Sequence, residues 1–256
     1  MQARLERIGH RYEKARKVYR IGISALSGSV NAHIVDLWWD SAELEWLLSQ
    51  NDAALDVILA AAGQAGGRIG VAFLRAKRRL EDSFQQLQIP WKYRLKWLKL
   101  RILLELLTGS IESAIETART FQAAEIEGDH QHESLVVTIL SLIYNHIVIL
   151  RNHARPGLLR DLVHSALESY PNNTFILGMF LESEKSEGMW GRVRALLGER
   201  RVAQAKEKPL SRRVMEIWFC NWEDGRWFGE IERIRSCLEA ATASYRSVNL
   251  MKVAEI

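Results

Sequence analysis

The chain has 256 residues, of which 48% are hydrophobic and 26% charged, and it carries a formal net charge of +4. These values are ordinary for a soluble globular protein with a sizeable core, and the small net charge argues against a strong non-specific polyanion binder. Two cysteines exclude a disulfide framework, and the charged, amphipathic N-terminus does not resemble a signal peptide.

Apolar residues recur along most of the chain at the spacing of amphipathic helices. The pattern predicts helices over residues 4–26, 34–50, 52–62, 71–87, 91–107, 111–126 and 135–151. Short breaks separate these helices, including a turn over residues 27–31 and a glycine cluster over residues 63–70. We interpret the glycine cluster as an inter-helix loop, because no strand precedes it and no phosphate-binding lysine follows it.

The stretch over residues 161–197 shows the helical rhythm most clearly. One helix ends before Pro171, and Asn173 or Thr174 is placed to cap the next one. Gly188 ends that second helix before a third begins. A helix, a tight turn and another helix, with no strand signal, are typical of stacked helical hairpins.

The hairpin rhythm continues to the end of the chain. A last pair of helices is predicted over residues 214–222 and 231–244. We therefore expect an all-α fold, a right-handed α-α superhelix (solenoid), in which residues 1–256 form one array. The chain begins and ends within the repeating pattern, as a fragment of a longer array would.

A short motif recurs within this pattern, with a small or apolar residue fifth, a large apolar residue seventh and a glutamate eighth. It occurs in Trp38–Glu45, Phe175–Glu182 and Glu216–Glu223. The motif resembles the first helix of the half-a-TPR (HAT) repeat, roughly Trp-x-x-Tyr-Ala-x-Phe-Glu. The second HAT helix is echoed by Ala15–Tyr19, and again by Ala166 and Leu167 with Pro171. The resemblance implies a solenoid of HAT/TPR-like hairpins.

A closer resemblance covers about forty residues of the central stretch. Ser165–Leu177, followed by Arg192–Arg194, looks like the nuclear-RNAi-defective (NRDE) family. This resemblance implies a nuclear protein of RNA silencing, surveillance or splicing, with partners such as the nuclear exosome helicase and splicing factors. It implies no catalytic residues.

Residue patterns that would carry catalysis or metal binding are absent from the sequence. No nucleophile elbow, Walker loop or HExxH run occurs. His130 and His132 lack the cysteine or carboxylate partners of a metal site. We expect a non-catalytic protein with no cofactor, no metal, no small-molecule substrate and no membrane partner.

The region over residues 68–101 is the most basic part of the chain. One interpretation is an RNA-backbone track with aromatic stacking on Trp91, Tyr93 and Trp97. Its candidate contacts are Arg75, Arg78, Arg79, Lys92, Lys96 and Lys99. The alternatives are a solvated face over core aromatics, an acidic partner, or the chain's own acidic segment over residues 36–56.

Two adjacent tryptophans suggest a partner-binding surface, because neighbours on a helix point about 100° apart. Trp38 holds the first aromatic position of the motif and is predicted to be core. Trp39 is then the candidate for a groove that receives a partner helix or peptide, although it could equally pack on the neighbouring repeat. Asp40 and Glu43 are candidates for pairing with basic residues of that partner.

The sequence as a whole predicts a protein-interaction scaffold in nuclear RNA processing, which binds a partner helix or peptide in a solenoid groove. The alternative function is direct RNA-backbone binding by the basic helices over residues 68–101.

Overall fold

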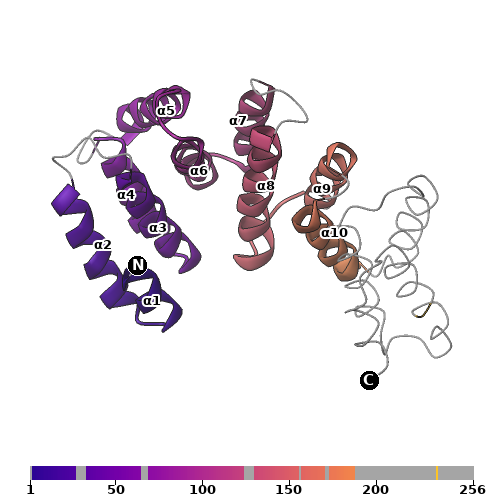
Figure 1. Ribbon diagram of the computed structural model, residues 1–256, viewed down its shortest axis with the longest axis horizontal. Coiled ribbons are helices and arrows are strands. Elements are labelled where there is room, and N and C mark those ends of the chain that lie inside the picture. Colours follow the sequence, from indigo (N-terminus) through magenta and orange to yellow (C-terminus); the bar gives the residue numbers. More distant parts are fainter. Residues whose placement is uncertain are drawn as a thin grey trace, which may run out of the picture. The chain divides into compact units, whose positions relative to one another are not determined.

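The computed structural model (Figure 1) describes residues 2–26, 33–64, 69–123, 130–155, 157–170, 173–187 and 235. Every regular element in these ranges is helical, so the chain is all-α. The helices predicted beyond residue 188 and the motif copy Glu216–Glu223 lie outside the described residues. The chain divides into two compact units, residues 1–156 and 157–256, and a single array across both stays a prediction.

The first unit contains the helices expected from the apolar spacing, with small shifts at their ends. They are α1 (Gln2–Ile8), α2 (Tyr12–Leu26), α3 (Ile34–Leu47), α4 (Asn51–Ala61), α5 (Ile69–Gln85), α6 (Trp91–Thr108), α7 (Ile111–Ala123) and α8 (His130–Tyr144). A π-helical turn, η1 (Asn145–Ile149), extends α8.

The first predicted helix is in fact two, α1 and α2. His10 adopts a left-handed backbone with φ of +56°. The amides of His10 and Arg11 donate to the carbonyls of Arg7 and Glu6, which is the Schellman pattern that ends a helix. The chain then reverses, so that α1 packs against α2, and both contribute buried residues to one cluster with α3.

Helices α3 and α6 form the centre of the first unit. Helix α3 packs against α2, α4 and α6, while α6 packs against α3, α4, α5, α7 and α8. Leu98, Leu100 and Ile102 of α6 are fully buried although they point in different directions. A helix surrounded by neighbours is apolar on most sides. The hairpins α3–α4 and α5–α6 therefore enclose a common core.

Among the described helices, the segment His130–Ile149 is the one long and apolar enough to cross a membrane. Of its apolar stretch, 44% is buried inside the fold. Its buried face packs on α6 and α7. A core helix of this kind needs an apolar composition whether or not a membrane is present.

The second unit contains one described hairpin, α9 (Leu158–Ser169) and α10 (Thr174–Glu187). The predicted cap is confirmed, because Asn173 Oδ1 accepts hydrogen bonds from the amides of Phe175 and Ile176 at 3.0 and 3.1 Å. The two helices pack through buried side chains that include Val163, Leu167, Ile176, Leu177, Phe180 and Leu181.

Replacing Leu167 by aspartate tests this packing. Leu167 is 1% exposed, so the new carboxylate would be buried without a partner. We expect a loss of at least about 3 kcal/mol in unfolding free energy. Ser165→Asp introduces the same group at an exposed position of α9 and should leave the denaturation midpoint nearly unchanged. Equal midpoints for the two variants in circular-dichroism melts would contradict the packing.

Candidate functional site

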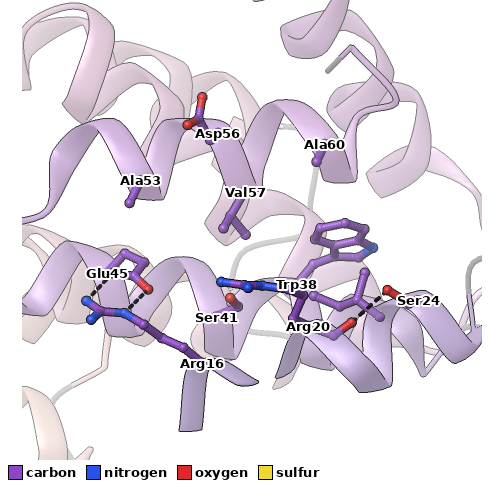
Figure 2. A pocket seen from close by; sticks show the side chains of 11 residues that line it. Arg16, Arg20, Ser24, Trp38, Ser41, Glu45, Ala53, Asp56, Val57 and Ala60 are labelled. Atoms are coloured by element: carbon purple, nitrogen blue, oxygen red, sulfur yellow. Dashed lines mark hydrogen bonds and ion pairs between the residues drawn. The ribbon is translucent and has the colours of Figure 1, made fainter. Parts of the chain in front are cut away.

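A pocket of about 350 Å³ lies between α2, α3 and α4 and is the candidate site (Figure 2). Helix α3 contributes Trp38, Ser41 and Glu45 to the lining, and the other lining residues come from α2 and α4. The side chains that define its chemistry are Arg16, Arg20, Trp38, Ser41, Glu45 and Val57.

The pocket is elongated along the helices. Its lining residues extend from Arg16 to Ser24 on α2 and from Ala53 to Ala60 on α4. At 1.5 Å per residue these spans correspond to a length of about 10–12 Å, or roughly two helical turns. A pocket of this length can hold a short extended or helical peptide segment.

Arg16 and Glu45 form an ion pair at one end of the pocket. The Arg16 guanidinium donates two hydrogen bonds to the Glu45 carboxylate, each 2.7 Å long. This bidentate bond raises the pKa of Arg16 above its usual value, against the opposing effect of burial. The Glu45 side chain is only 8% exposed, so the arginine provides the charge that this buried carboxylate requires.

The middle of the pocket holds a second arginine, Arg20, one turn from Arg16. No carboxylate among the described residues pairs with its guanidinium, which lies near Ser41 and Trp38 in Figure 2. Asp56 also borders the pocket, but its side chain points away from Arg20 in the same view. The pocket therefore combines an unneutralised positive charge with apolar walls.

The expected environments of the two tryptophans are reversed. Trp39 is 2% exposed, whereas Trp38 is half-buried and lines the pocket. The reason is that α6 packs on α3 and covers Trp39, which places the amine of Lys99 5.1 Å from the centre of the Trp39 ring. Of the two alternatives left open for Trp39, the structure supports packing on a neighbouring helix, and the placement on a partner surface is wrong.

Asp40 and Glu43 are also used within the fold rather than presented to a partner. Arg4 donates to both oxygens of Asp40, at 2.7 and 3.2 Å, and Arg7 donates to Glu43 at 2.6 Å. Both arginines belong to α1. The basic residues that were expected from a partner are thus supplied by the chain's own first helix.

Most of the basic residues on α6 likewise contact other parts of the fold. Lys96 lies 3.8 Å from Asp36, the contact expected if the chain's own acidic segment neutralises this region. Lys99 is largely buried, and this burial, with the nearby charge of Lys96, lowers its pKa. Tyr93 is 3% exposed, so it offers no stacking surface for a base. Tyr93 and Lys99 are therefore not available to an RNA track on α6, whereas stacking on the partly buried Trp91 and Trp97 stays a prediction.

Three arginines of α5 remain on the surface. Arg75, Arg78 and Arg79 are exposed, and none is paired with a described carboxylate. Lys92 is exposed too, with its amine 4.6 Å from the centre of the Tyr93 ring. Of the six residues predicted to form a basic surface, these four are therefore the exposed ones.

A buried polar network joins α5, α6 and α7. Glu105 accepts hydrogen bonds from Lys77 at 2.8 Å, Arg101 at 2.7 Å and Ser113 at 3.2 Å. Burial alone would raise the pKa of Glu105, but the bonds and charges of the two cations outweigh it and lower the pKa. Each charged group of this network has a partner within the fold, so we assign the network to stability rather than to binding.

The pocket residues were missed at the sequence level for identifiable reasons. Arg20 shares a face with Arg16 at a spacing of four residues, but charges at this spacing on an amphipathic helix do not by themselves indicate a pocket. Trp38 was assigned to the core from its position in the motif.

The described residues contain no group of three or more histidine, cysteine or acidic side chains that could hold a metal ion.

Comparisons of the chain with protein-family models, curated proteins and solved structures find no match. The function therefore rests on the residues themselves.

The two pocket arginines should differ in what they do for stability. Arg16→Ala removes the partner of a buried carboxylate, and we expect a loss of about 3 kcal/mol in unfolding free energy. Arg20→Ala removes an unpaired, exposed group and should change stability by less than about 0.5 kcal/mol. Denaturant titration of both variants measures the difference, and comparable losses would show that Arg20 has a structural role.

The Glu105 network predicts a specific response to acid. Because its folded pKa is lowered, its stabilising contribution is present above the unfolded pKa and is lost as the pH falls through the folded value. The gap in unfolding free energy between the wild type and Glu105→Gln should therefore be large at neutral pH and shrink below about pH 4. Glu112→Gln, at an exposed position of α7, is the control. A gap independent of pH would contradict the ionised network.

Proposed function

We propose that the chain is a non-catalytic protein-interaction scaffold that binds a helix or peptide of a partner protein in the α2–α3–α4 pocket. The observation that carries this proposal is the half-buried Trp38 beside an unpaired Arg20 in an elongated pocket. Tryptophan and arginine are the residues that most often concentrate binding energy at protein interfaces.

The second motif copy supports the same use of an aromatic residue. Phe175 occupies the position in α10 that Trp38 occupies in α3, and it is 47% exposed. In both copies the fifth and seventh residues are buried: Ala42 and Leu44 in α3, and Met179 and Leu181 in α10. The first position of the motif is thus available for contacts outside the core in both described copies.

We further propose that the hairpins form a right-handed solenoid of the HAT type. The successive packed pairs α1–α2, α3–α4, α5–α6, α7–α8 and α9–α10 support this arrangement. The core shared by the neighbouring hairpins α3–α4 and α5–α6 also supports it, because stacked repeats bury a continuous core.

The cellular setting that we propose is nuclear RNA processing, in silencing, surveillance or splicing. Its support is the resemblance of Ser165–Leu177 to the NRDE family and of the repeated motif to HAT proteins. Partners would be nuclear RNA-processing proteins such as the exosome helicase or splicing factors.

A second candidate function is contact with an RNA backbone through α5. Arg75, Arg78 and Arg79 share its exposed face without a described carboxylate partner. Each phosphate contact releases counterions, so binding at this face should weaken steeply with salt. Replacing the three arginines by glutamate should abolish it, and binding that survives this change would remove α5 from consideration.

Affinity purification from nuclear extract separates the two functions. We expect the wild-type chain to retain its protein partners after nuclease treatment, and Trp38→Ala to lose them. Trp97→Ala removes another half-buried tryptophan, outside the pocket, and should retain them. Loss of all partners on nuclease treatment would instead favour the RNA function.

A further inference from the structure

The charges around the α2–α3–α4 pocket define what it can bind. Arg16 and Glu45 neutralise each other at one end through two hydrogen bonds of 2.7 Å. Asp40 and Glu43 on α3 are held by arginines of α1. Arg20 is the remaining charge in the described lining that points into the pocket without a partner. Asp56, the other unpaired charge of the described lining, points away from Arg20 in Figure 2, so an anionic group could pair with Arg20 without meeting a carboxylate beside it.

The apolar part of the pocket begins beside Arg20. Ile23 follows Arg20 by three residues on α2 and also lines the pocket, and Val57 lines it from α4. The Trp38 indole lies on the same side of the pocket as Ala60 in Figure 2. An anionic group on Arg20 would thus lie next to an apolar group on Trp38.

We infer that the pocket recognises an acidic peptide of a partner protein, in which an Asp or Glu carboxylate pairs with Arg20 and a bulky apolar side chain packs on Trp38. This inference rests on the proposed scaffold function and adds the chemistry of the partner. Arginine binds carboxylates through paired, charge-assisted hydrogen bonds, and aromatic anchors supply apolar contact area.

The geometry favours a peptide over RNA at this site. An RNA strand needs a track of several cations along its phosphates, and the pocket offers one unpaired arginine. The two-turn length of the pocket matches a helix that places an acidic and an apolar residue three or four positions apart.

The test begins with a library of random twelve-residue peptides displayed on phage and selected on the whole chain. We expect enriched sequences to carry Asp or Glu within four positions of Leu, Ile, Phe or Trp. One enriched peptide is then labelled with a fluorophore, and its affinity is measured by anisotropy. Enriched sequences that lack acidic residues, or that are basic, would overturn the inference.

Two matched variants locate the charge that is recognised. Arg20→Glu should weaken binding at least about tenfold, because it replaces an attractive pair by a repulsive one. Lys17→Glu makes the same charge change on an exposed residue of α2 outside the pocket and should alter affinity less than about twofold. A peptide with its acidic residue changed to Lys should bind Arg20→Glu better than it binds the wild type.

The outcomes separate the inference from the scaffold function. Binding that depends on Trp38 but is unchanged in Arg20→Glu would leave the scaffold function in place and refute the acidic partner. Failure to select any peptide, or selection of peptides indifferent to both residues, would refute both.

Discussion

The first unit depends on the neutralisation of one acidic face of α3. Asp40 and Glu45 are almost fully buried, and buried carboxylates are stable only when a cation and hydrogen bonds replace water. Arg4 and Arg16 supply those cations from α1 and α2, which places the two N-terminal helices against α3. With that face covered, α3 packs its other sides on α4 and α6. The basic N-terminus and the acidic segment that follows are thus two halves of one structural interface.

The same constraint governs the middle of the chain. Glu105 is buried on α6 and requires Lys77 and Arg101, so these cations are not available to a polyanion. Charge density along a sequence is therefore a poor guide to charge density on a surface. Of the region over residues 68–101, chiefly the outer face of α5 and Lys92 remain exposed and positive.

Sequence reasoning predicted the helices well because amphipathic periodicity is a local property. The N-terminal cap at Asn173 and the buried face of Leu167 followed from the same pattern. It failed where several neighbours compete for one helix. Trp38 and Trp39 differ by one position, and only the packing of α6 on α3 decides which of them is core. The break at His10 was missed because its left-handed backbone is accompanied by a tertiary reversal that periodicity does not record.

The division of roles along α2 has a consequence for how such a protein can diversify. Arg16 stabilises the fold, whereas Arg20, one turn later, makes no described ion pair. Residues at the pocket that carry little of the folding free energy are free to vary under selection without the loss of stability that usually limits new specificities. Under the proposed function, changes at Arg20 would redirect a duplicated copy to a different partner, while α3 and its ion pairs keep the fold unchanged.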